Sequence, residues 1–71
     1  MWLENSYSAI LNMYLQKYHQ LKIHIGRDGK ITKTEKEENG NWLSDRNLRK
    51  ILNQLPSNIS SSKNLIIILK Q

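Results

Sequence analysis

Apolar side chains between residues 3 and 18 recur at intervals of three and four positions, which is the spacing of one face of an α-helix. This apolar set is Leu3, Tyr7, Ile10, Leu11, Tyr14, Leu15 and Tyr18. Polar side chains such as Asn12 and Lys17 fall mainly on the other side. The pattern predicts an amphipathic helix over residues 3–18 that packs on a core through its apolar face.

Two extended segments joined by a tight turn are predicted after this helix. Residues 21–25 alternate between apolar and polar side chains, which indicates a half-buried strand. Its apolar face is Leu21, Ile23 and Ile25. The Asp28-Gly29 pair favours a hairpin turn, because glycine accepts the positive φ that such turns require. Residues 30–36 then predict a returning strand that is largely polar and solvated.

A second helix is predicted after a polar loop at residues 37–41. Ser44 is the expected N-cap, and Asp45 in the first turn complements the helix dipole. Leu43 and Leu48 stand at the spacing of a hydrophobic staple. The apolar stripe of this helix is Leu48, Ile51, Leu52 and Leu55.

The end of the chain predicts a last strand. Pro56 ends the second helix, because proline cannot continue helical hydrogen bonding. Residues 57–63 form a flexible connection, and residues 64–70 read as a strand. Its apolar run, residues 65–69, has no polar interruption. The strand is therefore buried on both faces, or it is buried on one face and offers the other to a partner.

These elements define a small α+β domain with the order helix, strand, strand, helix, strand. The simplest packing is a three-stranded sheet with both helices on one face, and residues 1–71 form a single domain. The expected core is Leu11, Tyr14, Leu15, Ile23, Ile25, Trp42, Leu48, Ile51, Leu52, Leu55, Ile66 and Ile68.

The charge balance bears on the class of partner. The chain has 11 Lys+Arg against 6 Asp+Glu and a net charge of +5, which favours acidic partners such as nucleic acid, an anionic membrane surface or an acidic protein. The candidate basic patch is Arg46, Arg49, Lys50 and Lys63. The alternative is a mixed-charge surface that only keeps the domain soluble, because Glu35 and Asp45 are interspersed.

Signatures of catalysis, cofactor binding and metal binding are missing from the sequence. His19 and His24 have no carboxylate or thiol at a metal-site spacing, and the chain contains no cysteine. The glycines belong to turns rather than to a phosphate-binding loop. We therefore expect a non-enzymatic protein with no cofactor and no metal. No apolar run reaches the roughly 18–20 residues of a membrane span.

One family resemblance is carried by residues 21–69. The stretch begins with the alternating strand and the turn Arg27-Asp28-Gly29-Lys30-Ile31, followed by a second strand and a polar Asn-Gly loop. It continues with a helix over residues 45–52, the Leu55-Pro56 helix stop and a final apolar strand. In this order of elements, and in the D-G-[KR] turn, the chain resembles the C-terminal domains of TonB and TolA proteins.

The resemblance implies a periplasmic domain that transmits inner-membrane energy to an outer-membrane partner. Such a domain binds an extended peptide of its partner at a sheet edge, and it is a fragment of a longer, membrane-anchored chain. The alternative function is that of a small basic nucleic-acid-binding or regulatory protein of phage or plasmid type. That protein would be complete at 71 residues and cytoplasmic.

The last strand is the expected binding edge. A terminal strand that enters by a crossover often lies at an edge, where unpaired N–H and C=O groups invite another strand. No charge or proline interrupts the apolar run, so we expect the edge to be used by a partner segment or by a second copy in a homodimer. Ile66 and Ile68 are expected to face the helices. The expected partner-binding residues are Asn64, Leu65, Ile67, Leu69 and Lys70.

Overall fold

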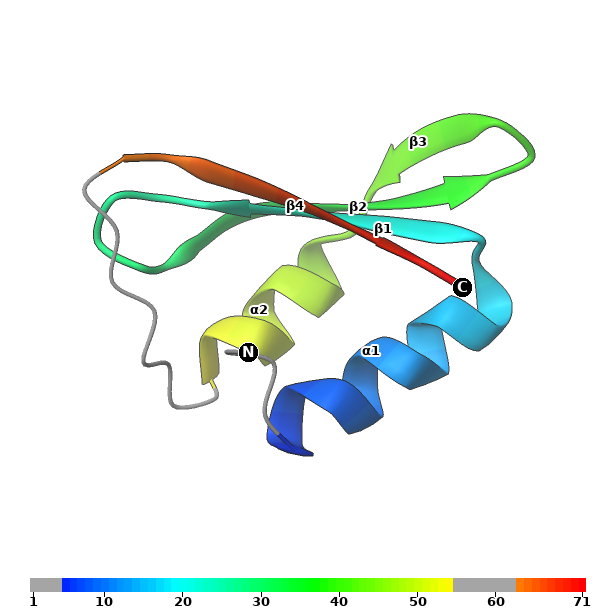
Figure 1. Cartoon of the computed structure of the whole chain (residues 1–71), viewed down its shortest axis with the longest axis horizontal. Helices are drawn as coiled ribbons and strands as arrows, with labels where there is room; N and C mark the ends of the chain where they lie inside the picture. Colours follow the sequence, from blue (N-terminus) through cyan, green and yellow to red (C-terminus); the bar gives the residue numbers. More distant parts are fainter. Residues whose placement is uncertain (1–4, 55–62) are drawn as a thin grey trace.

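The computed structural model describes residues 5–54 and 63–71 of the chain. The elements, in chain order, are α1 (Asn5–Lys17), β1 (Gln20–Ile25), β2 (Ile31–Glu38), β3 (Asn41–Ser44), α2 (Arg46–Gln54) and β4 (Leu65–Lys70). The strands form one antiparallel sheet with the order β3-β2-β1-β4. Both helices lie on the same face of this sheet (Figure 1). The predicted α+β class and the one-sided placement of the helices are confirmed.

The sheet has four strands, so the predicted three-stranded sheet is wrong. The predicted loop at residues 37–41 is a second hairpin, in which Glu38 is the last residue of β2 and pairs with Asn41. Asn39 and Gly40 have φ values of 55° and 82°, the left-handed backbone that a two-residue type I′ turn requires. The Asn39-Gly40 pair is the sequence signal for this hairpin. The polar residues around it led instead to the prediction of a loop.

The first helical turn of α2 is capped by Asp45 rather than by Ser44, which is the last residue of β3. The N–H of Leu48 donates a hydrogen bond to the Asp45 carboxylate at 2.9 Å, the usual N-cap geometry. Leu43 is 42% exposed, so the predicted staple with Leu48 is wrong as well. The predicted helix stop at Pro56 lies outside the described residues.

The core lies between the sheet and the helices and consists of aliphatic side chains. Its buried members are Leu11, Leu21, Ile23, Ile25, Ile31, Leu48 and Leu52. Tyr14 and Leu15 of α1 are half-buried against it, and Ile51 of α2 is also half-buried. The prediction for Trp42 is wrong, because its side chain lies on the face of the sheet away from the helices, beside Lys22. The predicted core residue Leu55 lies outside the described part of the chain.

The first hairpin turns at Gly26–Gly29 as predicted. Gly29 has a φ of 85°, and its N–H donates to the carbonyl of Gly26 at 3.0 Å. The strand register shifts beyond this turn, so that Ile25 pairs with Ile31 whereas His24 pairs with Lys33. The extra residue, Thr32, forms a bulge, and the shift places Ile31 on the buried face.

Candidate functional site

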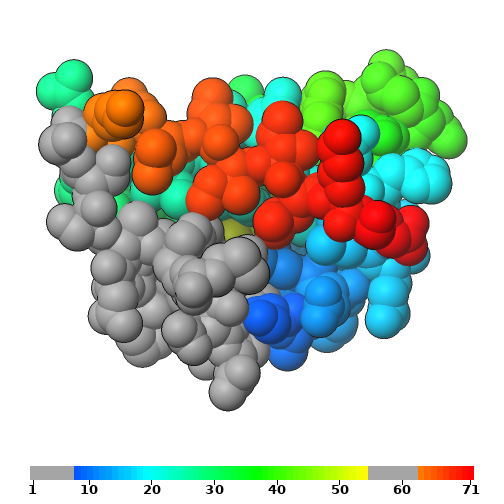
Figure 2. All heavy atoms as spheres, viewed as in Figure 1, coloured from blue at the N-terminus to red at the C-terminus, as the bar shows by residue number. Residues whose placement is uncertain are grey.

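The last strand, β4, lies at one edge of the sheet. It pairs with β1 along its whole length, from Gln20 opposite Lys70 to Ile25 opposite Leu65. Among the described residues no strand pairs with its other side. In Figure 2 the atoms of β4, orange to red, form a continuous strip on the near surface of the molecule. The predicted edge position of the last strand is confirmed.

The side chains of β4 alternate between the two faces of the sheet in the opposite sense to the prediction. Leu65, Ile67 and Leu69 pack against the core, whereas Ile66 and Ile68 are 60% and 49% exposed. The expectation that Ile66 and Ile68 face the helices is therefore wrong.

The pairing with β1 explains this orientation. Directly opposed residues in an antiparallel pair lie on the same face, and Ile67 stands opposite the buried Ile23. Leu69 stands opposite Leu21 in the same way. Because every residue of the run is apolar, its own pattern carried no information about which side chains face inward.

At every second residue of β4 the backbone N–H and C=O groups have no partner among the described residues. Just beyond the strand, the N–H of Gln71 donates to the carbonyl of His19 at 3.1 Å, in the same register as the strand pairing. Hydrogen-bonded and non-hydrogen-bonded pairs alternate along an antiparallel ladder. The N–H and C=O groups of Ile66, Ile68 and Lys70 therefore point away from β1, toward the free edge.

The same alternation holds at the opposite side of the sheet. The N–H of Asp45 donates to the carbonyl of Thr34 at 2.9 Å, which continues the β2–β3 register by one residue. Thr34 and its alternate neighbours in β2 thus point their backbone groups toward β3. The edge formed by β3 is only four residues long, whereas β4 offers six.

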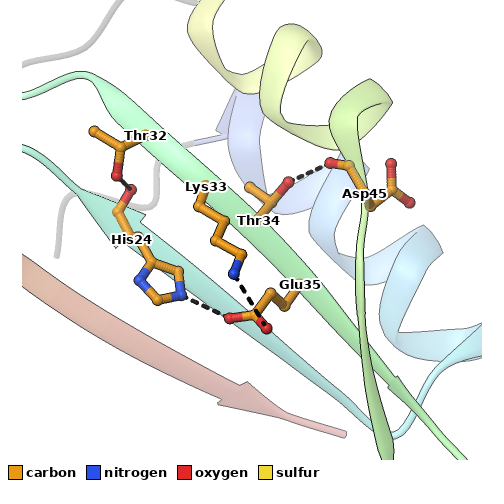
Figure 3. Close-up of polar contacts among 6 residues, drawn as sticks. All are labelled: His24, Thr32, Lys33, Thr34, Glu35 and Asp45. Carbon is orange, nitrogen blue, oxygen red and sulfur yellow. Dashed lines mark hydrogen bonds and ion pairs between the residues drawn. The ribbon is translucent and has the colours of Figure 1, made fainter.

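The exposed side chains of β4 lie beside polar side chains of β1 on the open face of the sheet. Ile66 stands opposite His24, whose Nε2 lies 2.7 Å from Oε1 of Glu35 (Figure 3). Hydrogen bonding to His24 lowers the pKa of Glu35. Ile68 stands opposite Lys22, whose Nζ lies 4.3 Å from the ring centroid of Trp42. These cross-strand contacts were missed in the sequence, although the alternation in residues 21–25 placed Lys22 and His24 on one face.

The helix-covered face holds a second polar cluster beneath β2. The Thr34 hydroxyl donates to the backbone carbonyl of Asp45 (Figure 3), and the Asp45 carboxylate lies 3.1 Å from Nζ of Lys36. Burial raises the pKa of Asp45, but the Leu48 N–H and the Lys36 ammonium outweigh it, so the net shift is downward. The hydrogen bond with Asp45, with a smaller contribution from Tyr18, raises the pKa of Lys36.

The predicted basic patch is brought together only in part. Arg46 and Arg49 of α2 line a hollow of about 280 Å³ with Lys33 of β2. Thr32, Thr34, Ser44 and Asp45 complete its lining. Lys50 and Lys63 do not contribute to this hollow. It lies at the β2–β3 side of the sheet, away from β4.

Comparison with protein-family models, with curated proteins and with solved structures finds no match to this chain. The resemblance to TonB and TolA domains therefore stays a prediction. Within residues 5–54 and 63–71, no three His, Asp or Glu side chains gather closely enough to hold a metal ion. No helix in that part of the chain is long and apolar enough to cross a membrane.

Proposed function

We propose that this chain is a non-enzymatic protein-interaction domain that binds an extended segment of a partner along β4. The observation that carries the proposal is the row of outward-pointing N–H and C=O groups at Ile66, Ile68 and Lys70. A partner strand placed beside β4 would pair with these groups and extend the sheet. In strand addition of this kind the backbone supplies affinity, and alternate side chains supply specificity.

The chemistry of the edge supports this use. Natural edge strands are kept from pairing by charges, prolines, bulges or short length. The edge at β3 is short, but residues 65–69 of β4 contain no charge and no proline. The exposed side chains of Ile66 and Ile68 would lie beside partner side chains on the open face. Apolar partner residues at alternate positions would bury that surface.

The TonB/TolA resemblance supplies a setting for the proposal. In the setting that the resemblance implies, the domain would work in the periplasm and bind an extended segment of an outer-membrane protein during transport. Asn64 and Lys70 flank the apolar run and would contact the ends of the bound segment. Leu65, Ile67 and Leu69 pack against the core. They would contact the partner only through the parts of their side chains that lie along the sheet edge on the helix-covered face.

A peptide selection tests this function. Linear peptides are selected from a random display library on the wild-type domain, and their binding is compared with Ile68→Pro and Ile68→Ala. Proline removes an N–H that has no partner among the described residues, whereas alanine keeps that N–H and shortens only the exposed side chain. Binding should therefore be weakened by Ile68→Ala and lost with Ile68→Pro. Circular dichroism melts establish that both variants fold.

Two results would overturn the strand-addition function. One is equal binding of the selected peptides to the wild type and to Ile68→Pro. The other is a set of NMR shift changes on peptide binding that leaves the amides of Ile66, Ile68 and Lys70 unmoved.

A second candidate function, nucleic-acid binding, is favoured by one observation. Lys33, Arg46 and Arg49 line a single hollow together with the hydroxyl side chains of Thr32 and Ser44. Cations and hydroxyls of this kind contact phosphate oxygens in protein–DNA complexes. The hollow lies at the other side of the sheet, so variants there separate this function from strand addition at β4.

A further inference from the structure

The edge of β4 is complementary to itself. We propose that the strand added at this edge is β4 of a second copy of the chain, in an antiparallel pair whose two-fold axis passes through Ile67. The inference rests on the proposed use of β4 for strand addition and names the partner. The pairing would join the two four-stranded sheets into one continuous sheet.

The backbone restricts the possible registers of such a pair. Only Ile66, Ile68 and Lys70 within β4 direct their N–H and C=O groups outward. Each must therefore stand opposite a partner residue whose backbone groups also point outward. An axis through Ile67 satisfies this condition, because it sets Ile66 opposite the partner's Ile68. A shift by a single residue would set outward groups against inward ones and break the ladder.

The side chains select among the remaining registers. With the axis through Ile67, the two copies of Ile67 meet, and Leu65 stands opposite the partner's Leu69. Every residue of the apolar run is then matched by an apolar residue. The axis through Ile68 would set Ile66 opposite the partner's Lys70, and the axis through Ile66 would set Leu69 opposite the partner's Lys63.

Charge is also accommodated in the register centred on Ile67. Lys70 stands opposite the partner's Asn64, so the two copies of Lys70 lie at opposite ends of the ladder. Like charges directly opposed across strands are destabilising, and this register avoids them. Each copy carries a net charge of +5, so salt should strengthen the dimer by screening the repulsion between copies.

Single-cysteine variants read out the register, because the natural chain contains no cysteine. Non-hydrogen-bonded pairs in antiparallel sheets hold their Cα atoms about 4.5 Å apart, within the range of a disulfide. Ile67→Cys should therefore form a disulfide-linked dimer under mild oxidation. The matched controls Ile66→Cys and Ile68→Cys should not cross-link when each is oxidised alone.

Analytical ultracentrifugation of the wild type supplies the second measurement. We expect a concentration-dependent dimer that tightens with salt, that is weakened but still formed in Ile68→Ala and that is lost in Ile68→Pro. This arm does not depend on the folding of the cysteine variants. Cross-linking of Ile68→Cys in place of Ile67→Cys, or a wild-type monomer at every concentration, would overturn the inference.

The peptide selection distinguishes failure of the dimer proposal from failure of the strand-addition function. If the wild type stays monomeric but binds selected peptides, and if that binding is lost with Ile68→Pro, strand addition stands and the second copy is rejected as the partner. If the wild type stays monomeric and no peptide binds β4, both proposals are rejected.

Discussion

At the scale of single residues, Asp45 links α2 to β2. Its carboxylate caps α2 through the N–H of Leu48 and forms an ion pair with Lys36 of β2. Its backbone N–H and C=O both bond to Thr34. The Asp45 side chain is only 8% exposed, and a buried charge is tolerated when it is paired and hydrogen-bonded. The cap and the ion pair together satisfy this requirement.

The lowered pKa of Asp45 makes part of the stability depend on pH. Carboxyl groups of unfolded chains titrate at about pH 4, so below that pH the unfolded state binds a proton that the folded state resists. The contribution of the Asp45 charge is therefore present above about pH 4 and lost as pH falls through the folded pKa. Asp45→Asn should be less stable than the wild type at pH 7, and the difference should shrink toward pH 2.

Urea melts between pH 2 and pH 7 check this expectation. Asparagine also serves as an N-cap, so Asp45→Asn isolates the charge, and Asp45→Ala should lose about 1 kcal/mol more by removing the cap. A difference between wild type and Asp45→Asn that stays constant over this pH range would show that the Asp45 charge does not stabilise the fold.

At the scale of elements, the two hairpins are set by residues with left-handed backbone. Gly29 ends the first turn at a φ of 85°, and Gly40 ends the second at 82°. A β-branched side chain is strained in this region of backbone space, at about 1–3 kcal/mol. Gly29→Val should therefore lower the free energy of unfolding by that amount.

Lys30→Ala is the matched control for this turn. The side chain of Lys30 is exposed, and its N–H bond to the Asp28 carboxylate is kept by alanine. Chemical denaturation of the two variants should show loss of stability only for Gly29→Val. Equal stability of the two variants would mean that the turn tolerates a side chain at Gly29.

The elements also show how far the sequence alone could predict the fold. Alternation in residues 21–25 gave the buried face of β1, because a one-sided strand records its orientation in its own pattern. The run in β4 records none, so the exposure of Ile66 depends on its register with β1. β3 was missed because its strand is held by backbone pairing with β2 and not by an apolar pattern.

The candidate site was predictable to a similar extent. Its place at the last strand followed from chain order and from the missing charge and proline. The residues whose backbone groups point outward did not, because that depends on the phase of the β1–β4 hydrogen bonds. The hollow lined by Arg46, Arg49 and Lys33 joins α2 to β2, and only Arg46 and Arg49 were grouped by sequence spacing.

At the scale of the whole molecule, the two sides of the sheet suit different partners. β4 offers an apolar edge with outward-pointing backbone groups, whereas the β2–β3 side carries the cations of the hollow. If the hollow binds nucleic acid, affinity must fall steeply with salt, because each neutralised phosphate releases counterions. Arg46→Glu with Arg49→Glu should then abolish the binding of a fluorescent DNA or RNA oligonucleotide, measured by anisotropy across a salt series.

If strand addition is the main function, we expect the opposite result in the oligonucleotide-binding measurement. Binding of the oligonucleotide should be weak and independent of base sequence at physiological salt, and Ile68→Pro should leave it unchanged. Tight, sequence-specific binding that is lost in the double charge reversal would favour nucleic-acid binding as the main function.

Residue-by-residue hydrogen exchange of β4, measured by NMR at a concentration where sedimentation shows a monomer, tests the free edge most directly. The amides of Ile67 and Leu69, which donate to β1, should exchange slowly. Those of Ile66, Ile68 and Lys70 should exchange nearly as fast as in an unstructured chain, because they have no partner in residues 5–54 and 63–71. Uniformly slow exchange of residues 65–70 in that monomer would contradict the account, since it would show that the outer side of β4 is already paired.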